Sequence, residues 1–317
     1  MAQDSPQFWG KAYGYIIQSD SPLLPPLARL DGNADVPLVP DILIHQGQLG
    51  DLATSGSADQ IISAKIPGFG KFWMIEGREL VVDPEAPRSL ADLRPIILGS
   101  AMAVLLQQRQ QLVLHASCIG IGGQAIAFLG NSGWGKSTLA SVLHSKGYDF
   151  VTDDVLAINV QSTPPKAVSS YPEVRLLPDT LEALGHTLEL EETDQSFHWK
   201  QEKRVSSRIS EQPLPLLCLY VLAGGSTLEA EAIAPPSAFL ELSHHSRAIR
   251  VVNSLHVPSL RARHFQQCMT LVQKVPLFYL RRRRSLAELS QVVTFLESHV
   301  AQLLDQERTR STFSGEG

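Results

Sequence analysis

Residues 124–138 read QAIAFLGNSGWGKST. The run Ala125–Leu129 is typical of a buried parallel strand, and the glycines and lysine after it have the spacing GxxxxGKS of a phosphate-binding loop. A polyphosphate needs many hydrogen-bond donors on a tight curve, and backbone N–H groups supply them where no Cβ blocks the approach. Residues 137–146 have helical composition and Gly147 follows them, so strand, loop and helix occur in the required order. The stretch predicts a nucleoside triphosphate site.

Each part of the loop has an expected role in that site. Lys136 would reach the β and γ phosphate oxygens, and the Ser137 hydroxyl would be a ligand of Mg²⁺. ATP and Mg²⁺ are therefore the expected cofactors. The remaining nucleotide-binding residues predicted from the motif are Gly130, Asn131, Ser132, Gly133, Trp134, Gly135 and Thr138.

Composition narrows the class of protein. With 317 residues, 44% hydrophobic and 19% charged, the chain is typical of a globular protein large enough for two domains. The net charge of -5 argues against nucleic acid as a partner. The three cysteines lie far apart, which predicts neither a zinc site nor disulfides and favours a reduced, cytoplasmic setting. We expect no membrane segment, because no apolar run approaches the length of about 20 residues that a spanning helix needs.

The chain divides into three expected regions. Residues 1–90 mix short apolar runs with Pro, Gly, Asp and Ser, which predicts a small β-rich domain of unknown role. Residues 91–308 begin with a helix to about Gln111 and then alternate strands and helices, which predicts an α/β fold. A polar, charge-mixed segment, 189–210, predicts a mobile excursion able to act as a lid. The small, polar residues 309–317 predict a disordered tail.

Two carboxylates follow a second apolar strand. The segment Phe150–Asp154 reads FVTDD and comes soon after Lys136. At the carboxyl end of a strand beside the loop, one aspartate would orient Mg²⁺ through water and the other would accept a proton from an attacking hydroxyl. Sequence alone leaves open whether Asp153 or Asp154 is the base. Because neighbours along a strand face opposite ways, one of them is also compatible with a structural role.

His115 closes the strand Leu112–Leu114, just before the loop strand. A lone histidine after an apolar run is equally compatible with a hydrogen-bonded core residue. If the strand before it pairs with the loop strand, His115 would approach the two aspartates and tune their proton affinity.

In order and spacing, His115, the Gly130–Ser137 loop and Val151–Asp154 resemble the catalytic half of HPr kinase/phosphorylase, a bacterial enzyme that phosphorylates a serine of a sugar-transport carrier protein. The resemblance covers residues 110–180 and extends more loosely to about 290. It implies a P-loop kinase fold similar to phosphoenolpyruvate carboxykinase, a Ser/Thr-hydroxyl acceptor, ATP with Mg²⁺, an aspartate base beside a histidine, and a homo-oligomer.

Departures from that family narrow the expectation. Family enzymes carry Ser-Glu after the loop lysine, where this chain has Ser137-Thr138. Their later glycine-containing signature survives here only as EVRLLPD over 173–179, with Glu173 and Arg175 kept. The resemblance implies that Glu173 joins Ser137 and Asp154 at Mg²⁺ and that Arg175 pairs with a phosphate; a salt-bridged strand edge is the alternative. Because the glycines are associated with dephosphorylation, we expect a one-way kinase, similar to HPr-kinase-like proteins of peptide-tailoring gene clusters.

The run Arg281–Arg284 is the densest basic stretch. Without interleaved aromatic residues in an acidic chain, it favours a surface or subunit contact over nucleic acid. His244 and His245 lack a metal-ligand pattern and are expected at the surface.

These features together predict an ATP-dependent kinase whose acceptor is a serine of a protein or precursor peptide. Two alternatives stay open at this stage. One is a small-molecule kinase or carboxykinase-like enzyme on the same fold. The other is a P-loop ATPase that gates the binding or assembly of a partner.

Overall fold

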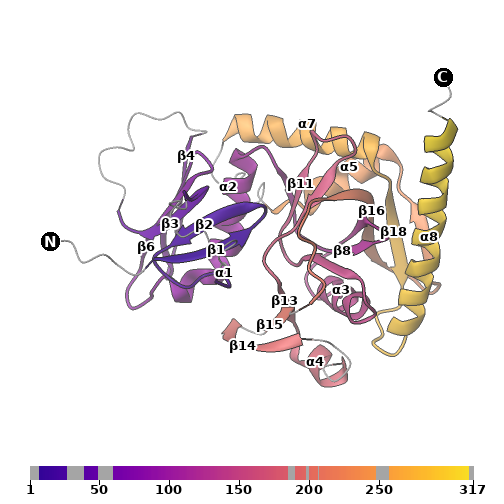
Figure 1. Cartoon of the computed structure of the whole chain (residues 1–317), viewed down its shortest axis with the longest axis horizontal. Coiled ribbons are helices and arrows are strands. Elements are labelled where there is room, and N and C mark those ends of the chain that lie inside the picture. The colour runs from indigo at the N-terminus through magenta and orange to yellow at the C-terminus, as the bar shows by residue number, and fades with distance from the viewer. Residues whose placement is uncertain are drawn as a thin grey trace, which may run out of the picture.

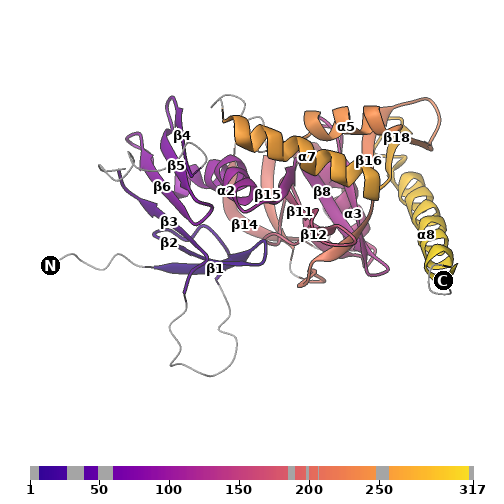
Figure 2. The same cartoon turned by 90° about the horizontal axis from the view of Figure 1, so that it is seen from above.

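The computed structural model describes residues 7–26, 39–48, 60–184, 190–197, 200–205, 207–247 and 257–313 of the chain. A β-sheet unit formed by the N-terminal residues packs beside a larger unit in which strands and helices mix (Figures 1 and 2). The mixed α/β class and the β-rich character of the N-terminal region are both confirmed.

The N-terminal region forms a six-stranded sheet in the order β1-β2-β3-β6-β5-β4. Its strands are β1 (Phe8–Ala12), β2 (Tyr15–Ser19), β3 (Ile42–Gln46), β4 (Ile61–Ile66), β5 (Gly70–Ile75) and β6 (Glu79–Pro84). Buried and more exposed side chains alternate along β5, so its buried side chains lie on one face of the sheet and can form part of a hydrophobic core. The sequence also suggests a short apolar strand at residues 36–39, of which only Val39 lies within the described ranges.

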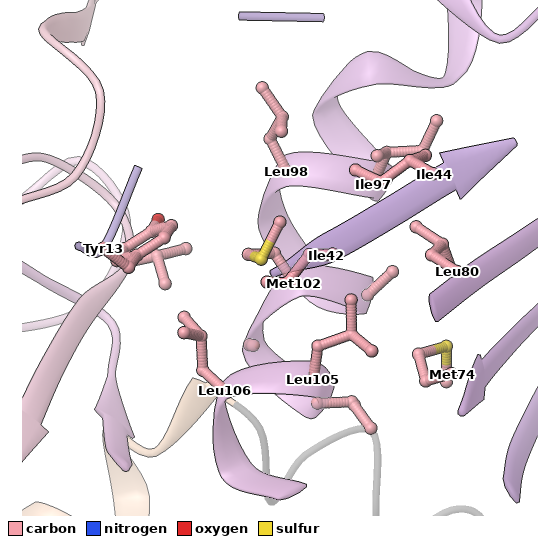
Figure 3. Close-up of a cluster of buried hydrophobic side chains, with 14 of the residues drawn as sticks. Tyr13, Ile42, Ile44, Met74, Leu80, Ile97, Leu98, Met102, Leu105 and Leu106 are labelled. Atoms are coloured by element: carbon pink, nitrogen blue, oxygen red, sulfur yellow. The ribbon is translucent and has the colours of Figure 1, made fainter. Parts of the chain in front are cut away.

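A helical segment after the sheet covers that face. It contains η2 (Ala91–Leu93), α1 (Arg94–Ile96), the π-helical turn η3 (Ile97–Ala101) and α2 (Met102–Gln108). Figure 3 shows Ile97, Met102 and Leu105 of this segment together with Ile42, Ile44, Met74 and Leu80 of the sheet. The same buried cluster includes Val113, Ala157 and Tyr171 of the α/β unit. The hydrophobic core is therefore continuous across residue 90, and the domain boundary there stays a prediction.

The central sheet of the α/β unit has nine strands. Seven follow the order β10-β8-β9-β16-β12-β11-β7, while β18 pairs with β16 and β17 pairs with β18. Their bounds are β7 (Leu112–Leu114), β8 (Ala116–Ile121), β9 (Gln124–Leu129), β10 (Asp149–Thr152), β11 (Leu156–Asn159), β12 (Lys166–Val168), β16 (Leu214–Gly224), β17 (Glu229–Ala232) and β18 (Leu277–Arg282).

The loop strand β9 has one parallel and one antiparallel neighbour. It runs parallel to β16, as its apolar sequence predicts, but it forms an antiparallel hairpin with β8. The hairpin turn is Gly122-Gly123, with φ of 59° and 79°, a left-handed conformation that suits two-residue hairpins. The strand before His115, β7, pairs with β11 and not with the loop strand. The pairing assumed from the sequence for that strand is therefore wrong, because β8 takes the place beside β9.

Helices cover both faces of this sheet. Buried residues of α3 (Lys136–Ser145) and α8 (Leu289–Phe313) share one core with β9 and β16, and those of α5 (Pro235–His244) and α7 (Pro258–Lys274) share another. The last helix continues to Phe313, so a disordered tail from Thr309 is wrong for residues 309–313; residues 314–317 lie outside the described ranges. Within the described ranges, no helix combines the length and apolar character required to span a membrane.

The segment predicted to be a mobile excursion contains two β-strands. A three-stranded antiparallel sheet joins β13 (Glu173–Leu176), β15 (Lys200–Val205) and β14 (Leu190–Phe197), with α4 (Pro178–Leu184) beside it. Within 189–210, Val205 of β15 belongs to the core that contains α3, and β15 pairs with β13, whose Val174 and Leu176 are in the same core. Polar residues between these apolar residues hide the strand pattern. The mobility and the lid role of this segment stay predictions.

Candidate phosphate-binding site

The loop between β9 and α3 has the backbone that its glycines predict. Gly130, Gly133 and Gly135 have φ of 151°, 79° and 86°, which side chains with a Cβ rarely adopt. Lys136 is 6% exposed, and its Nζ donates to the carbonyl oxygens of Gly130 at 2.7 Å and Asn131 at 3.3 Å. The lysine ammonium is thus held at the start of the loop.

Asp153 follows β10 and lies at the first turn of α3. Its Oδ1 accepts hydrogen bonds from the hydroxyl of Ser137 at 2.9 Å and from the hydroxyl of Ser117, and its Oδ2 accepts one from the backbone N–H of Arg175 at 3.0 Å. Ser117 belongs to β8. The hairpin of β8 and β9, which was not predicted from the sequence, therefore contributes to this site. Three donors fix the carboxylate next to the loop serine.

Asp154 points into a different group of side chains. Its carboxylate lies 2.9 Å from Nδ1 of His115, 3.1 Å from Nη2 of Arg247 and 3.2 Å from Nη1 of Arg175. His115 lies beside Asp154, although β7 pairs with β11 and not with the loop strand on which the expected approach depended. Asp154 has a φ of 71°, an uncommon value for a residue with a Cβ, and this places its side chain away from that of Asp153.

The charge of Asp154 is set by competing effects. Burial raises the pKa of this carboxyl, but Arg247, the hydrogen bond to His115 and Arg175 together hold it well below its usual value. Asp154 is therefore ionised at neutral pH. Nδ1 of His115 lies 2.9 Å from this carboxylate and 3.2 Å from Nη1 of Arg247, so the imidazole contacts both the acid and one of the guanidinium groups beside it.

The N-terminal unit lies next to Asp154 and its partners His115, Arg175 and Arg247, which we call the Asp154 group. Tyr13, in the turn between β1 and β2, is 3% exposed and donates its N–H to the carbonyl of Ser169. Asp154, Arg175 and Arg247 act electrostatically on its hydroxyl, and a Cβ added at Gly99 of η3 would lie 2.9 Å from Nη2 of Arg247. The two structural units therefore meet at the Asp154 group.

Glu173 is not placed beside the other two predicted metal ligands. It forms a buried ion pair with Arg94 of α1, with side chains 7% and 4% exposed, and Arg94 also donates to the carbonyl of Leu23. Ser137 in turn contacts Asp153 and not Asp154. Among the described residues, no group of three or more His, Cys, Asp or Glu side chains is arranged to hold a metal ion. The set Ser137, Asp154 and Glu173 is therefore not assembled, because each carboxylate has other charged partners.

Two hollows flank the loop. The first has a volume of only about 30 Å³ and is lined by Gly133, Gly135, Lys136, Ser137, Thr138 and Arg175, together with Leu176 and Leu177. It brings together much of the predicted nucleotide-binding set. The second, of about 590 Å³, lies at the carboxyl ends of β9, β16 and β18 and is lined on the loop side by Gly130, Asn131 and Trp134. Ser132 is exposed on the loop and lines neither hollow.

No known family profile and no curated protein sequence matches this chain. Among solved structures, it is similar to the Hpr(Ser) kinase/phosphatase from Coxiella burnetii, with 9% sequence identity and a TM-score of 0.34, over 60% of this chain and 97% of that one. With that TM-score, the likeness supports no conclusion about the site or the activity.

Several residues of the site were not identified from the sequence. Arg247, two positions after His245, carries no motif, and only the fold brings it to Asp154. The basic run at the end of β18 was expected at the surface or a subunit contact, but Arg282 is 6% exposed and contacts the loop. His245, also expected at the surface, is 3% exposed, and its carbonyl accepts from the N–H of His115. It caps the C-terminus of α5, where its own N–H donates to the carbonyl of Glu241.

Proposed function

We propose that this protein is an ATP-dependent kinase that transfers the γ-phosphoryl group to a hydroxyl, most readily a serine of a protein or peptide. One observation carries the proposal: Ser137 and Asp153 are hydrogen-bonded at the loop, while the next residue, Asp154, pairs with His115. A loop that only binds a nucleotide needs the first contact, whereas transfer to a hydroxyl also needs a group that receives a proton.

The donor side of the reaction uses the loop. Its backbone N–H groups and Lys136 would bind the phosphates, and the donor set of Ser137 and Asp153 suits Mg²⁺, which prefers oxygen ligands and keeps several waters. Mg²⁺, when bound there, would neutralise charge on the phosphate oxygens. This assignment replaces Asp154 with Asp153 on the metal side and leaves Glu173 in its ion pair with Arg94.

The acceptor side uses the pair His115 and Asp154. The acceptor oxygen forms a bond to the γ-phosphorus, the bond from that phosphorus to the bridging oxygen breaks, and ADP leaves. The hydroxyl proton passes to the His115–Asp154 pair, in which the ionised carboxylate orients the imidazole. Arg175 and Arg247, both on Asp154, provide charge next to the transferring group.

The acceptor has a candidate entry. Lys136 Nζ lies at the carbonyls of Gly130 and Asn131, and a loop lysine marks the β/γ end of a bound triphosphate. Gly130 and Asn131 also line the hollow of about 590 Å³, so this hollow adjoins the γ end. Leu240, on its wall, is 65% exposed, which makes the hollow accessible from solvent to a hydroxyl carried on a larger chain.

Transfer can be tested before the acceptor is known. The protein would be incubated with [γ-³²P]ATP and Mg²⁺, separately with the macromolecular and the low-mass fraction of an extract of its source cells. We expect label in the macromolecular fraction that is recovered as phosphoserine and is absent without the protein. The matched control is Asp149→Asn, which alters an exposed aspartate of β10 and should retain transfer.

The other outcomes identify the alternatives. A labelled phosphoester only in the low-mass fraction would replace the proposal with a small-molecule kinase. Label released only as inorganic phosphate, at a rate that one fraction increases, would replace it with a nucleotide-gated ATPase. No binding of ATP and no label in either fraction would contradict all three.

A further inference from the structure

Arg282, the last residue of β18, and Arg284, two residues later, contact backbone carbonyls of the phosphate-binding loop. Nη2 of Arg282 donates to the carbonyl of Trp134 at 2.7 Å, and Nη2 of Arg284 donates to the carbonyl of Gly133 at 2.8 Å. The guanidinium of Arg284 also lies 5.3 Å from the centre of the Trp134 ring. We call Arg282 and Arg284 the arginine pair.

The other two arginines of the run have ordinary partners. Arg281 lies 2.7 Å from Glu231, and Arg283 lies 3.9 Å from Glu288, so each is next to a carboxylate. Among the described residues, neither member of the arginine pair has a carboxylate partner. Within the described residues, the run therefore contains two arginines with a nearby carboxylate and two arginines without one.

Arg282 is the unusual member. It is 6% exposed, its hydrogen bonds go to backbone carbonyls, and its Nε has no partner among the described residues. Burial and the neighbouring charge of Arg284 lower the pKa of Arg282. A buried cation without an anion is costly, and such a site becomes favourable when an anion is bound nearby.

Arg282 also fixes the direction of a loop amide. A peptide unit is planar and trans, so a carbonyl held on one side directs the N–H of the same unit to the opposite side. The hydrogen bond to the Trp134 carbonyl therefore directs the Gly135 N–H away from Arg282, and Gly135 lines the hollow with Lys136 and Ser137. A Cβ at Gly135 would lie 2.9 Å from Nη2 of Arg282, so a side chain there would displace the guanidinium from its present position.

We propose that the arginine pair forms part of the triphosphate site: Arg282 positions the loop amides and, with Arg284, supplies positive charge that the phosphates of ATP neutralise. The proposal rests on the proposed function. Arg282 is a positioning residue here, since it acts through the loop and not by contact with the reacting atoms.

The test is calorimetric binding of Mg-ATP to the full chain and to Arg282→Met. We expect the variant to bind at least about tenfold more weakly, because a charge-assisted hydrogen bond and a nearby charge are lost together. Arg283→Met removes the adjacent, exposed charge and should bind within about twofold of the wild type. Equal affinities for the wild type and Arg282→Met would overturn the proposal.

Stability and salt separate this role from a purely structural one. Without ATP, Arg282→Met should melt at the same temperature as the wild type or higher, because it removes an uncompensated buried charge. Its affinity should also depend less steeply on salt. A lower melting temperature together with an unchanged salt dependence would overturn the proposal and make Arg282 structural.

Arg284→Met is a second variant that keeps the proposal testable if Arg282→Met does not fold, because Arg284 is exposed. It should weaken Mg-ATP binding several-fold, and unchanged binding would count against the pair. If the wild type does not bind Mg-ATP at all, the proposed function fails as well. If the wild type binds and transfers phosphate while both variants behave normally, only the arginine pair is wrong.

Discussion

The Ser137 hydroxyl lies 2.9 Å from Oδ1 of Asp153, whereas the carboxylate of Asp154 faces His115. Two adjacent acids thus contact two different groups of side chains. The change of direction is made by the left-handed backbone of Asp154, whose φ is 71°. The metal side and the proton side that we propose for this site can therefore be tested separately.

Asp153→Asn should weaken the effect of Mg²⁺ on ATP binding. The amide keeps the shape but loses the charge next to Ser137, so we expect the Mg²⁺-dependent gain in ATP affinity to fall about 10- to 100-fold. Calorimetry with Mg²⁺ and with EDTA measures that gain. Asp149→Asn, on the exposed start of β10, is the control. A full Mg²⁺ effect in Asp153→Asn would exclude Asp153 from the metal side.

Asp154→Asn should change the pH dependence of stability. The folded-state pKa of Asp154 lies well below its usual value near 3.8, so its ionised form contributes stability above about pH 4, and that contribution is lost as pH falls through the folded pKa. At pH 7 the variant leaves Arg175 and Arg247 without this carboxylate and should lose about 3 kcal/mol. Urea unfolding at several pH values measures the difference, which should narrow below pH 4. A constant difference would contradict the assignment.

Glu173→Ala should lower the stability of the protein and leave the effect of Mg²⁺ on ATP binding unchanged. Breaking its buried ion pair with Arg94 leaves a guanidinium uncompensated, and we expect a loss of about 3–5 kcal/mol in the free energy of unfolding. Glu182→Ala, an exposed change on α4, should stay within about 0.5 kcal/mol of the wild type. Near-normal stability combined with a lost Mg²⁺ effect would instead make Glu173 a metal ligand.

Tyr13→Phe should stabilise the protein by about 1 kcal/mol, because the Tyr13 hydroxyl is buried and has no hydrogen-bond partner among the described residues. Tyr148→Phe gives the opposite control: it removes a hydroxyl bonded to Glu297 at 3.0 Å and should cost about 1 kcal/mol. Thermal or urea unfolding measures both. A clear loss of stability in Tyr13→Phe would reveal a partner of that hydroxyl at the Asp154 group.

Local patterns were sufficient for the loop and the two aspartates. The spacing of Gly130, Gly135 and Lys136 encodes a backbone conformation directly, and Asp153 and Asp154 immediately follow the strand that presents them. The turn Gly122-Gly123 also carried a hairpin signal, but bounding glycines are equally typical of a parallel strand, and the β8 pairing was missed.

Long-range partners were not predictable in the same way. Arg247 and Arg282 reach the site from distant parts of the chain, and a charged residue in isolation has no pattern that distinguishes the surface from a buried ion site. Glu173 shows the reverse problem. A motif-like position suggested a metal ligand, but Arg94, contributed by the helical segment after the N-terminal sheet, holds it in an ion pair.

The most direct test of the central claim is the rate of phosphoserine formation from [γ-³²P]ATP by the Asp153→Asn/Asp154→Asn double variant, compared with the wild type and with Asp149→Asn. Circular dichroism would establish that all three proteins are folded. If the two aspartates serve the metal and proton sides of a phosphotransfer site, the double variant should lose about a thousandfold in rate or more, and the control should not. A folded double variant with wild-type transfer would contradict the account.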